Sequence, residues 1–232
     1  MNKPLLVFIP GTLCDHRVFQ PINEHLSTFA DTLFIDFQQE SSLLQMCQTV
    51  LAKVKDRPFI PVGFSMGGFV AFELIRQATD QIQALILLSS NSHADVAGRA
   101  EGRQQQLALA TQQGLTSLMK DVYLPVYFSE PDSEHAELVL KMAEDLGLDC
   151  FEKQIKVLAQ RPDSLETLKT FSHPVLLISG ENDLPCPPSQ QKRMVKACQN
   201  AELHILPDSG HFALLEQSKT MAQLIKNWGS RN

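Results

Sequence analysis

Short apolar segments alternate with longer amphipathic segments along most of this chain of 232 residues. The apolar segments are five to seven residues long, which is the length of a strand, and ALILLSS at 84–90 is apolar through most of its length. A strand of that kind suits a parallel sheet, because helices cover both faces of such a sheet. The segments that we expect to be strands are 5–9, 32–37, 59–64, 84–90, 174–180 and 202–207.

The amphipathic segments have apolar residues at helical spacing and lie between the expected strands or after the last one. This order is typical of βαβ units joined by right-handed crossovers. It predicts an α/β fold with a mostly parallel sheet of about six strands and helices on both faces. The segments that we expect to be helices of this core are approximately 17–29, 41–55, 66–79, 188–199 and 212–228.

The long interval between the fourth and fifth expected strands has a different pattern. Its apolar residues recur at spacings of three and four within 99–113 and 132–160, and Gly114 and Gly147 interrupt that pattern. No segment in the interval is expected to be a strand. We therefore predict a helical cap over 93–170, inserted into a core formed by 1–92 and 171–232.

The composition restricts the class of protein and its partners. Hydrophobic residues make up 44% of the chain and charged residues 20%, which is ordinary for a folded soluble protein. The formal net charge is −6, and the sequence contains no long run of Lys and Arg. Since proteins that bind nucleic acid need clustered positive charge to neutralise phosphates, we expect no nucleic-acid partner.

The five cysteines lie far apart and form no CxxC pair, so the sequence predicts neither a zinc site nor a redox pair. We expect them to be reduced and the protein to be cytoplasmic. The first apolar run has five residues, which is too short for the core of a secretory signal, and no run reaches the length of about 18 residues that indicates a spanning helix. We therefore expect no membrane span.

Ser65 lies where a strand pattern gives way to a helix pattern, in the sequence Gly63-Phe64-Ser65-Met66-Gly67. This matches G-x-S-x-G, a tight turn that holds its serine in a strained conformation and presents the hydroxyl at the end of the strand. Side chains at the glycines would crowd the strand or the helix, and the start of the helix offers N–H groups to an anion. The pattern predicts that Ser65 is a nucleophile, the alternative being an ordinary turn serine.

Two further residues fall in loops that follow later strands, Asp183 in SGENDLPCP and His211 in LPDSGHFALLE. In a parallel sheet these loops emerge at the same edge as Ser65. A serine hydroxyl needs a neighbouring base to take its proton, and an imidazole works best when a carboxylate fixes its tautomer. We therefore predict a catalytic triad of Ser65, His211 and Asp183, with Glu181 and Asp208 as the alternative acids.

The chain resembles the α/β-hydrolase family over nearly its full length, because GFSMGG, GENDLPCP and SGHF match the motifs of that family in the order serine, acid, histidine. It is similar to small carboxylesterases, including those that act on pimeloyl-carrier-protein methyl esters, and to the menaquinone-pathway lyases. The resemblance implies an α/β-hydrolase fold that uses no metal and no organic cofactor. It also implies an oxyanion hole formed by the backbone N–H groups of Met66 and Thr12.

Two features depart from the pattern of the family. Pro10 stands where many members carry the histidine of an HG pair. Because the first expected strand directly precedes this loop, we expect the sheet to lack the antiparallel strands that lead it in many members. The oxyanion donor after Gly11 is a backbone group, and it therefore survives the loss of the histidine.

Four residues are candidates for contact with a substrate. His16 follows the expected oxyanion loop and His93 follows the fourth expected strand, with a plain surface role as the alternative for both. Tyr123 and Tyr127 belong to an aromatic run of the cap, which could contribute to an acyl pocket or could simply pack within the cap.

Together these residues predict a serine hydrolase that cleaves a small-molecule carboxylic ester or thioester through an acyl-enzyme. A lyase or a carbon–carbon bond hydrolase with the same triad is one alternative, because a fold hosts many chemistries. A ligand-binding protein that turns nothing over is another. The oligomeric state stays open.

Overall fold

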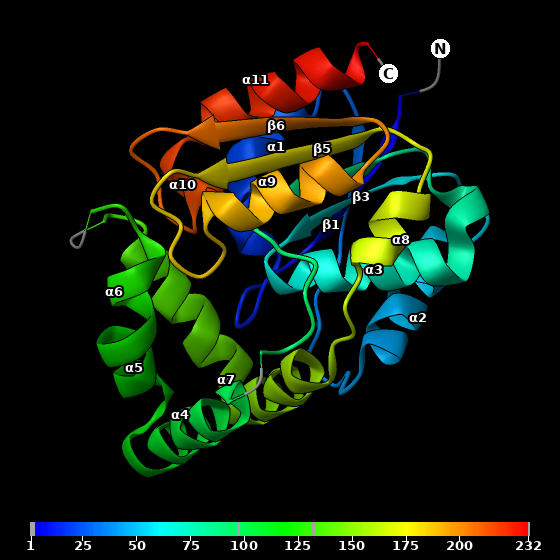
Figure 1. Cartoon of the computed structure of the whole chain (residues 1–232). Coiled ribbons are helices and arrows are strands. Elements are labelled where there is room, and N and C mark those ends of the chain that lie inside the picture. The colour runs from blue at the N-terminus through cyan, green and yellow to red at the C-terminus, as the bar shows by residue number, and fades with distance from the viewer. Residues whose placement is uncertain (1–2, 97, 131–132, 232) are drawn as a thin grey trace.

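The computed structural model describes residues 3–96, 98–130 and 133–231. At its centre, six strands form one sheet in the order β2-β1-β3-β4-β5-β6, and every neighbouring pair is parallel (Figure 1). The predicted α/β class and the predicted six strands are confirmed. The strands are β1 (Leu5–Ile9), β2 (Asp31–Phe34), β3 (Ile60–Phe64), β4 (Leu85–Leu88), β5 (Val175–Gly180) and β6 (Ala201–Leu206).

Two strands end earlier than their apolar segments predict. After β2, the N–H of Ile35 still donates to the carbonyl of Phe8 at 3.0 Å, and the chain then leaves the sheet. After β4, Ser89 adopts a positive φ of 46°, which a strand cannot continue through. Beyond β2, the apolar residues Ile35 and Phe37 are buried in the cluster that includes residues of α2 and α3, whereas the two residues beyond β4 are serines. Sequence patterns do not separate burial against helices from burial within a strand.

Helices cover both faces of the sheet. Alternate residues of each strand point to opposite faces, so Phe8 packs on the side of α1 and α11, while Val7 packs on the side of α2 and α3. Phe8 and Val7 are both completely buried, and burial of each such side chain stabilises the fold by roughly 1.5–3 kcal/mol. The helices of the core are α1 (Gln20–Leu26), α2 (Leu43–Val54), α3 (Met66–Ala78), α9 (Pro188–Ala197), α10 (Ala213–Glu216) and α11 (Ser218–Gly229), with short 3-10 turns at His16–Phe19 and Thr79–Gln81.

The described residues between β4 and β5 form helices and connecting loops and contain no strand. The predicted helix 99–113 is present, whereas the predicted helix 132–160 begins at Ala136, and residue 132 lies outside the described residues. Gly147 interrupts the second helix with φ 78° and ψ 177°. The elements are α4 (Arg99–Gln113), α5 (Leu115–Leu118), a π-helical turn (Met119–Tyr123), α6 (Leu124–Tyr127), α7 (Ala136–Gln160) and α8 (Leu165–Thr170).

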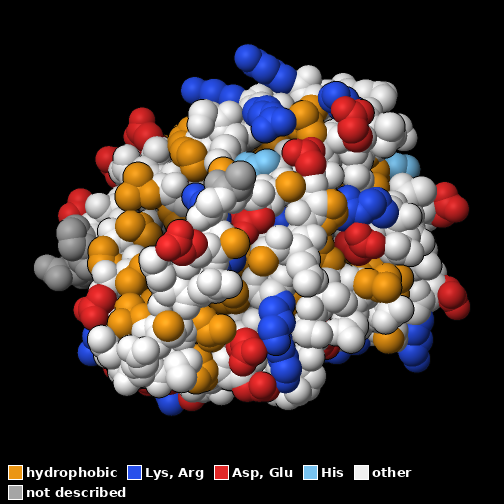
Figure 2. Space-filling model, turned by 60° about the horizontal axis from the view of Figure 1, so that its bottom comes forward, with side chains coloured by type: hydrophobic (Ala, Val, Ile, Leu, Met, Phe, Trp, Pro, Cys, Tyr) orange, Lys and Arg blue, Asp and Glu red, His pale blue; other side chains and the backbone are white. Residues whose placement is uncertain are grey.

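The segment from α4 to α7 stands beyond the carboxyl ends of the strands, whereas α8 lies against α3 and α9 (Figure 1). On the face that Figure 2 shows, hydrophobic side chains lie in small groups among acidic and basic ones. No helix within the described ranges combines the length and the apolar character needed to cross a bilayer. Because α4–α7 stand beyond the strand ends and α8 packs against α3 and α9, our interpretation of residues 93–170 as an inserted cap fits α4–α7 rather than α8.

Candidate active site

Ser65 occupies the corner between β3 and α3 in a strained conformation. Its φ is 49° and its ψ is −112°, values that L-residues rarely adopt and that cost on the order of 1–3 kcal/mol. The N–H of Ser65 donates to the carbonyl of Leu88 at 3.0 Å, and the hydroxyl of Ser90 donates to the carbonyl of Ser65 at 2.8 Å. These bonds from β4 and the loop after it hold the corner in place, as the G-x-S-x-G pattern predicts.

The glycines around Ser65 are explained by close contacts, with the backbone at Gly63 and Gly67 and with the Ser90 side chain at Gly68. A Cβ atom at Gly63 would lie 2.6 Å from the carbonyl oxygen of Gly67. A Cβ atom at Gly67 would lie 2.0 Å from the carbonyl oxygen of Ile9, and one at Gly68 would lie 2.1 Å from the hydroxyl oxygen of Ser90. The motif GFSMGG is therefore fixed by how tightly α3 starts against β1 and β4.

The His211 side chain reaches Ser65 from the loop after β6. Its Nε2 atom lies 3.0 Å from the Ser65 hydroxyl oxygen, and its Nδ1 atom lies 2.9 Å from Oδ1 of Asp183. The imidazole is 3% exposed, so water does not compete for these bonds. If Nδ1 carries the proton toward Asp183, Nε2 is free to accept the proton of the Ser65 hydroxyl.

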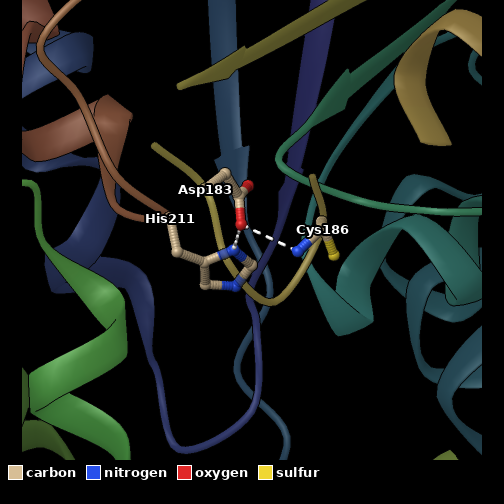
Figure 3. A group of neighbouring side chains, drawn as sticks. All are labelled: Asp183, Cys186 and His211. Carbon is tan, nitrogen blue, oxygen red and sulfur yellow. Dashed lines mark hydrogen bonds and ion pairs between the residues drawn. The ribbon is translucent and has the colours of Figure 1, made fainter. Parts of the chain in front are cut away.

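Asp183 is the acid that the structure brings to the histidine. It is 1% exposed, and its Oδ1 atom also accepts a hydrogen bond of 2.8 Å from the backbone N–H of Cys186 (Figure 3). Glu181 and Asp208, the alternative acids, are both exposed side chains at the surface. The three predicted triad residues therefore touch in the predicted order, from carboxylate to imidazole to hydroxyl.

Asp183, Cys186 and His211 are also near enough to one another to be considered as metal ligands, since their donor atoms lie within 4.8 Å (Figure 3). Burial raises the pKa of the Cys186 thiol far above its usual range, and the charge of Asp183 raises it further. A metal needs the thiolate, and here the thiol sulfur accepts a hydrogen bond of 3.3 Å from Asn91. The three residues are instead joined by hydrogen bonds, because Asp183 Oδ1 contacts both His211 Nδ1 and the backbone N–H of Cys186.

The two predicted oxyanion donors flank Ser65. Met66 is the first residue of α3, where backbone N–H groups lack partners within the helix and the helix dipole favours negative charge. Thr12 follows β1 and lines the same cavity as Ser65. Among the described residues, no acceptor is hydrogen-bonded to the N–H of Thr12 or Met66. The glycine at position 11 lets the loop that carries Thr12 pass close to Phe64, because a Cβ atom at Gly11 would lie 3.0 Å from the Phe64 ring.

A cavity of about 520 Å³ opens over Ser65 between the sheet edge and the cap. Tyr123 and Tyr127 line it, as predicted for an acyl pocket, whereas His16 and His93 are not among its lining residues. The His16 imidazole lies 3.0 Å from a carboxylate oxygen of Asp36 at the surface. The His93 ring lies 2.8 Å from the carbonyl of the next residue, so neither imidazole is placed by the structure to meet a substrate in this cavity.

The two tyrosines form an aromatic wall beside the histidine. The ring of Tyr127 stacks on the imidazole of His211 with centroids 5.5 Å apart, and Tyr123 stacks on Tyr127 at the same centroid distance. Burial raises the pKa of the Tyr123 phenol to about 12 and raises that of Tyr127 well above its usual value. Both phenols are neutral near pH 7, as ordinary phenols are, so the two rings form an uncharged aromatic wall in the cavity that Ser65 lines.

Three arginines that line the cavity were not predicted from the sequence. Arg99, Arg103 and Arg161 line it. Asp95 holds two of them, with its Oδ1 atom 2.7 Å from Arg103 and 3.0 Å from Arg161. Burial raises the pKa of this carboxyl, but the two guanidinium groups outweigh that effect and hold it below its usual value. Asp95 therefore pairs with two of the three guanidinium groups, and the lining of the cavity here carries a net positive charge.

Gln154 is a further residue of the site that was not predicted from the sequence. It lies on α7, is 1% exposed, and accepts a hydrogen bond of 2.7 Å from the backbone N–H of Leu13, the residue after Thr12. A glutamine on an apolar helix face is an unusual signal in itself, because a buried amide must find partners. Its partner 141 positions away could not be found from spacing.

Comparisons with known proteins define the class. The model of the alpha/beta hydrolase family matches residues 6–224, and the chain therefore belongs to this family. It is 27% identical over 231 residues to a pimeloyl-[acyl-carrier protein] methyl ester esterase of Nitrosomonas europaea, covering 92% of this chain and 91% of that protein. It is 22% identical over 246 residues to a 2-succinyl-6-hydroxy-2,4-cyclohexadiene-1-carboxylate synthase of Salmonella arizonae, covering 97% of this chain and 95% of that protein.

Among solved structures, the chain is similar to a thermophilic esterase from Thermogutta terrifontis, with a TM-score of 0.93 and 21% identity. The match covers 99% of this chain and 90% of that one. At this level of identity the likeness shows the fold, and the α/β-hydrolase fold predicted for the chain is confirmed.

Proposed function

We propose that this member of the alpha/beta hydrolase family is a serine hydrolase that cleaves a carboxylic ester or thioester through an acyl-enzyme. The observation that carries the proposal is the continuous contact from Asp183 to His211 to Ser65, at the floor of a cavity of about 520 Å³. Esterases among the relatives and the aromatic wall beside Ser65 support the same class of reaction.

In the proposed reaction, His211 Nε2 takes the proton of the Ser65 hydroxyl as its oxygen attacks the substrate carbonyl. The Asp183 carboxylate stabilises the imidazolium that forms, and the N–H groups of Thr12 and Met66 donate to the oxyanion. His211 then gives its proton to the leaving alcohol or thiol. Water, activated by the same imidazole, attacks the acyl group and releases the acid, which regenerates Ser65.

The three arginines that line the cavity, Arg99, Arg103 and Arg161, favour a substrate that carries an anionic group away from the reacting carbonyl. Arg103 and Arg161 each have N–H groups left after their bonds to Asp95, and a guanidinium pairs well with a carboxylate or phosphate. The relative from Salmonella arizonae is named for a carboxylate compound. An ester of a dicarboxylic acid, with one free carboxylate, fits both the aromatic wall and the arginines of the cavity.

Turnover of p-nitrophenyl butyrate tests the reaction class directly. We expect hydrolysis by the wild-type protein and loss of hydrolysis in Ser65→Ala, with the melting temperature unchanged. A matched control is Ser189→Ala, an exposed serine at the start of α9 that is remote from these contacts. Hydrolysis that persists in Ser65→Ala would reject the proposal.

A second candidate, a lyase or carbon–carbon bond hydrolase with the same triad, is favoured by the similarity to the synthase and by the arginines that line the cavity. Labelling with a fluorophosphonate probe separates the candidates. A protein that is labelled at Ser65 but does not hydrolyse p-nitrophenyl or dicarboxylic esters would support the lyase. A folded protein that never reacts at Ser65 would support a ligand-binding role without turnover.

A further inference from the structure

We infer that Gln154 on the cap helix α7 is a positioning residue for the oxyanion donor at Thr12, an inference that rests on the function proposed above. Gln154 is almost fully buried, and its Oε1 atom accepts a hydrogen bond of 2.7 Å from the N–H of Leu13. Leu13 directly follows Thr12. The cap thus contacts the backbone of the oxyanion loop one peptide away from the donor itself.

The loop at this point is a tight turn that needs support. Thr12 and Leu13 lie at its centre, and a hydrogen bond of 3.2 Å from the N–H of Cys14 to the carbonyl of Gly11 closes it. Leu13 has a φ of 54°, a conformation that is unfavourable for leucine. Without an acceptor for its N–H, this residue would lose the contact that favours the turn over an ordinary conformation.

Both ends of the Thr12–Leu13 peptide are held. Its N–H donates to Gln154, and its carbonyl accepts a hydrogen bond of 3.4 Å from the thiol of Cys14. The Thr12 N–H belongs to the preceding peptide, whose carbonyl is the one that accepts from Cys14 N–H. Two neighbouring peptides are therefore fixed in orientation, and the free N–H of Thr12 is fixed with them.

Gln154 is itself locked in the orientation that this role needs. Its Nε2 atom donates to the sulfur of Cys150 at 3.2 Å, and the Cys150 thiol donates to the carbonyl of Phe37 at 3.4 Å. Since Leu13 presents an N–H, the oxygen of the amide must be the atom that faces it. The chain of contacts runs from the core at Phe37 through α7 to the oxyanion turn.

Gln154→Met tests the inference, because methionine has a similar length but offers no carbonyl acceptor. In p-nitrophenyl butyrate hydrolysis we expect kcat to fall about 10- to 100-fold, somewhat less than the loss of a whole oxyanion donor, with KM changed less than about 3-fold. Gln154→Glu keeps an acceptor oxygen at the same reach, and we expect its kcat to exceed that of Gln154→Met.

The matched control is Val157→Ala, which removes buried volume from the same helix away from the oxyanion turn. We expect it to lower the melting temperature and to leave kcat within about 3-fold of the wild type. Equal losses of kcat in Gln154→Met and Val157→Ala would overturn the inference, because they would show a structural effect only. An unchanged kcat in folded Gln154→Met would overturn it as well.

Amide hydrogen exchange supplies a readout that needs no turnover. We expect faster exchange at the Leu13 amide in Gln154→Met and unchanged exchange there in Val157→Ala. If the wild-type protein hydrolyses no ester, the proposed function fails, and the exchange result alone then decides whether Gln154 holds the turn. Exchange at Leu13 that is the same in Gln154→Met and in the wild type would reject that role.

Discussion

The rim of the sheet and the cap line the same cavity, but they place their side chains by different means. At the rim, each residue of the proposed triad follows a strand, and the backbone decides where it lies: Ser65 has a strained φ of 49°, and Asp183 and His211 lie in the loops after β5 and β6. In the cap, Arg103 of α4 and Arg161 after α7 are held through their long side chains. Both pair with Asp95, and the guanidinium of Arg161 also donates to the carbonyls of His93 and Leu158.

This difference explains why the rim can be predicted from sequence motifs and the cap cannot. Contacts of backbone at the rim tolerate almost no change of residue type, so they leave motifs in the sequence. Contacts of long side chains in the cap can be replaced by others of similar reach, and they leave none. We expect the rim to carry the reaction, with Gln154 of the cap supporting its oxyanion turn, and the arginines of the cap to select the substrate. The substitutions below test that division.

The largest effect should come from the rim. Asp183→Asn keeps the size of the side chain but removes the charge that stabilises the His211 imidazolium, and the amide can favour the wrong tautomer of the ring. We expect kcat for p-nitrophenyl butyrate to fall about 10⁴-fold. Asp208→Asn is the control, because Asp208 is an exposed acid after the neighbouring strand. Similar activity in the two variants would contradict the assignment.

Gly67→Ala should damage the rim through the backbone. The new Cβ atom would lie 2.0 Å from the carbonyl oxygen of Ile9, so α3 or β1 must move. We expect a loss of about 3–5 kcal/mol in the free energy of unfolding, measured by urea denaturation. Gly102→Ala is the contrasting variant, because nothing lies within 4 Å of a Cβ atom there and its helix should gain stability. Equal stability of both variants would show that the corner is not tight.

The arginines of the cap should affect selection of the substrate rather than the reaction. Arg103→Met removes a guanidinium from the lining of the cavity, and we expect KM for a p-nitrophenyl monoester of a dicarboxylic acid to rise about 10- to 100-fold. Hydrolysis of uncharged p-nitrophenyl butyrate should stay within about 3-fold of the wild type. Arg57→Met is the control, since Arg57 pairs with Asp31 at the surface. A KM that rises equally for both esters would remove the role in selection.

The smallest effect concerns the pH dependence of stability. The pKa of Asp95 is held below its usual value by Arg103 and Arg161, so this carboxylate stabilises the fold fully above about pH 4, the pKa of an unfolded aspartate. That contribution is lost as the pH falls through the lower pKa of the folded protein. We expect Asp95→Asn to melt about 2–4 °C below the wild type at pH 7, and the difference to shrink below pH 4. A difference that stays constant to pH 3 would contradict this account.

Sequence patterns predicted the core closely and the cap only in outline. The alternation of apolar and amphipathic segments predicted all six strands, and the errors fell at ends such as Ser89, where a positive φ stops the strand. In the cap, the helical spacing predicted α4 and the break at Gly147. The pairing of Asp95 with two arginines depends on which faces of the cap helices meet, and periodicity carries no information on that.

The proposed site divides in the same way. Ser65, Asp183 and His211 could be named because each has a fixed place after a strand of a parallel sheet, and the structure brings them within hydrogen-bond distance. His16 and His93 lie near the expected loops in sequence, but their rings contact Asp36 and a backbone carbonyl. Nearness along the chain was not enough to place a side chain in the cavity.

Acid quenching of the protein during p-nitrophenyl butyrate turnover, followed by mass spectrometry, tests the central claim most directly. If His211 activates the Ser65 hydroxyl, a fraction of the protein gains one butyryl group, and the peptide that contains Ser65 carries it; Ser65→Ala gains none. Turnover with no butyryl group on any peptide, or with the group on a residue other than Ser65, would contradict the account.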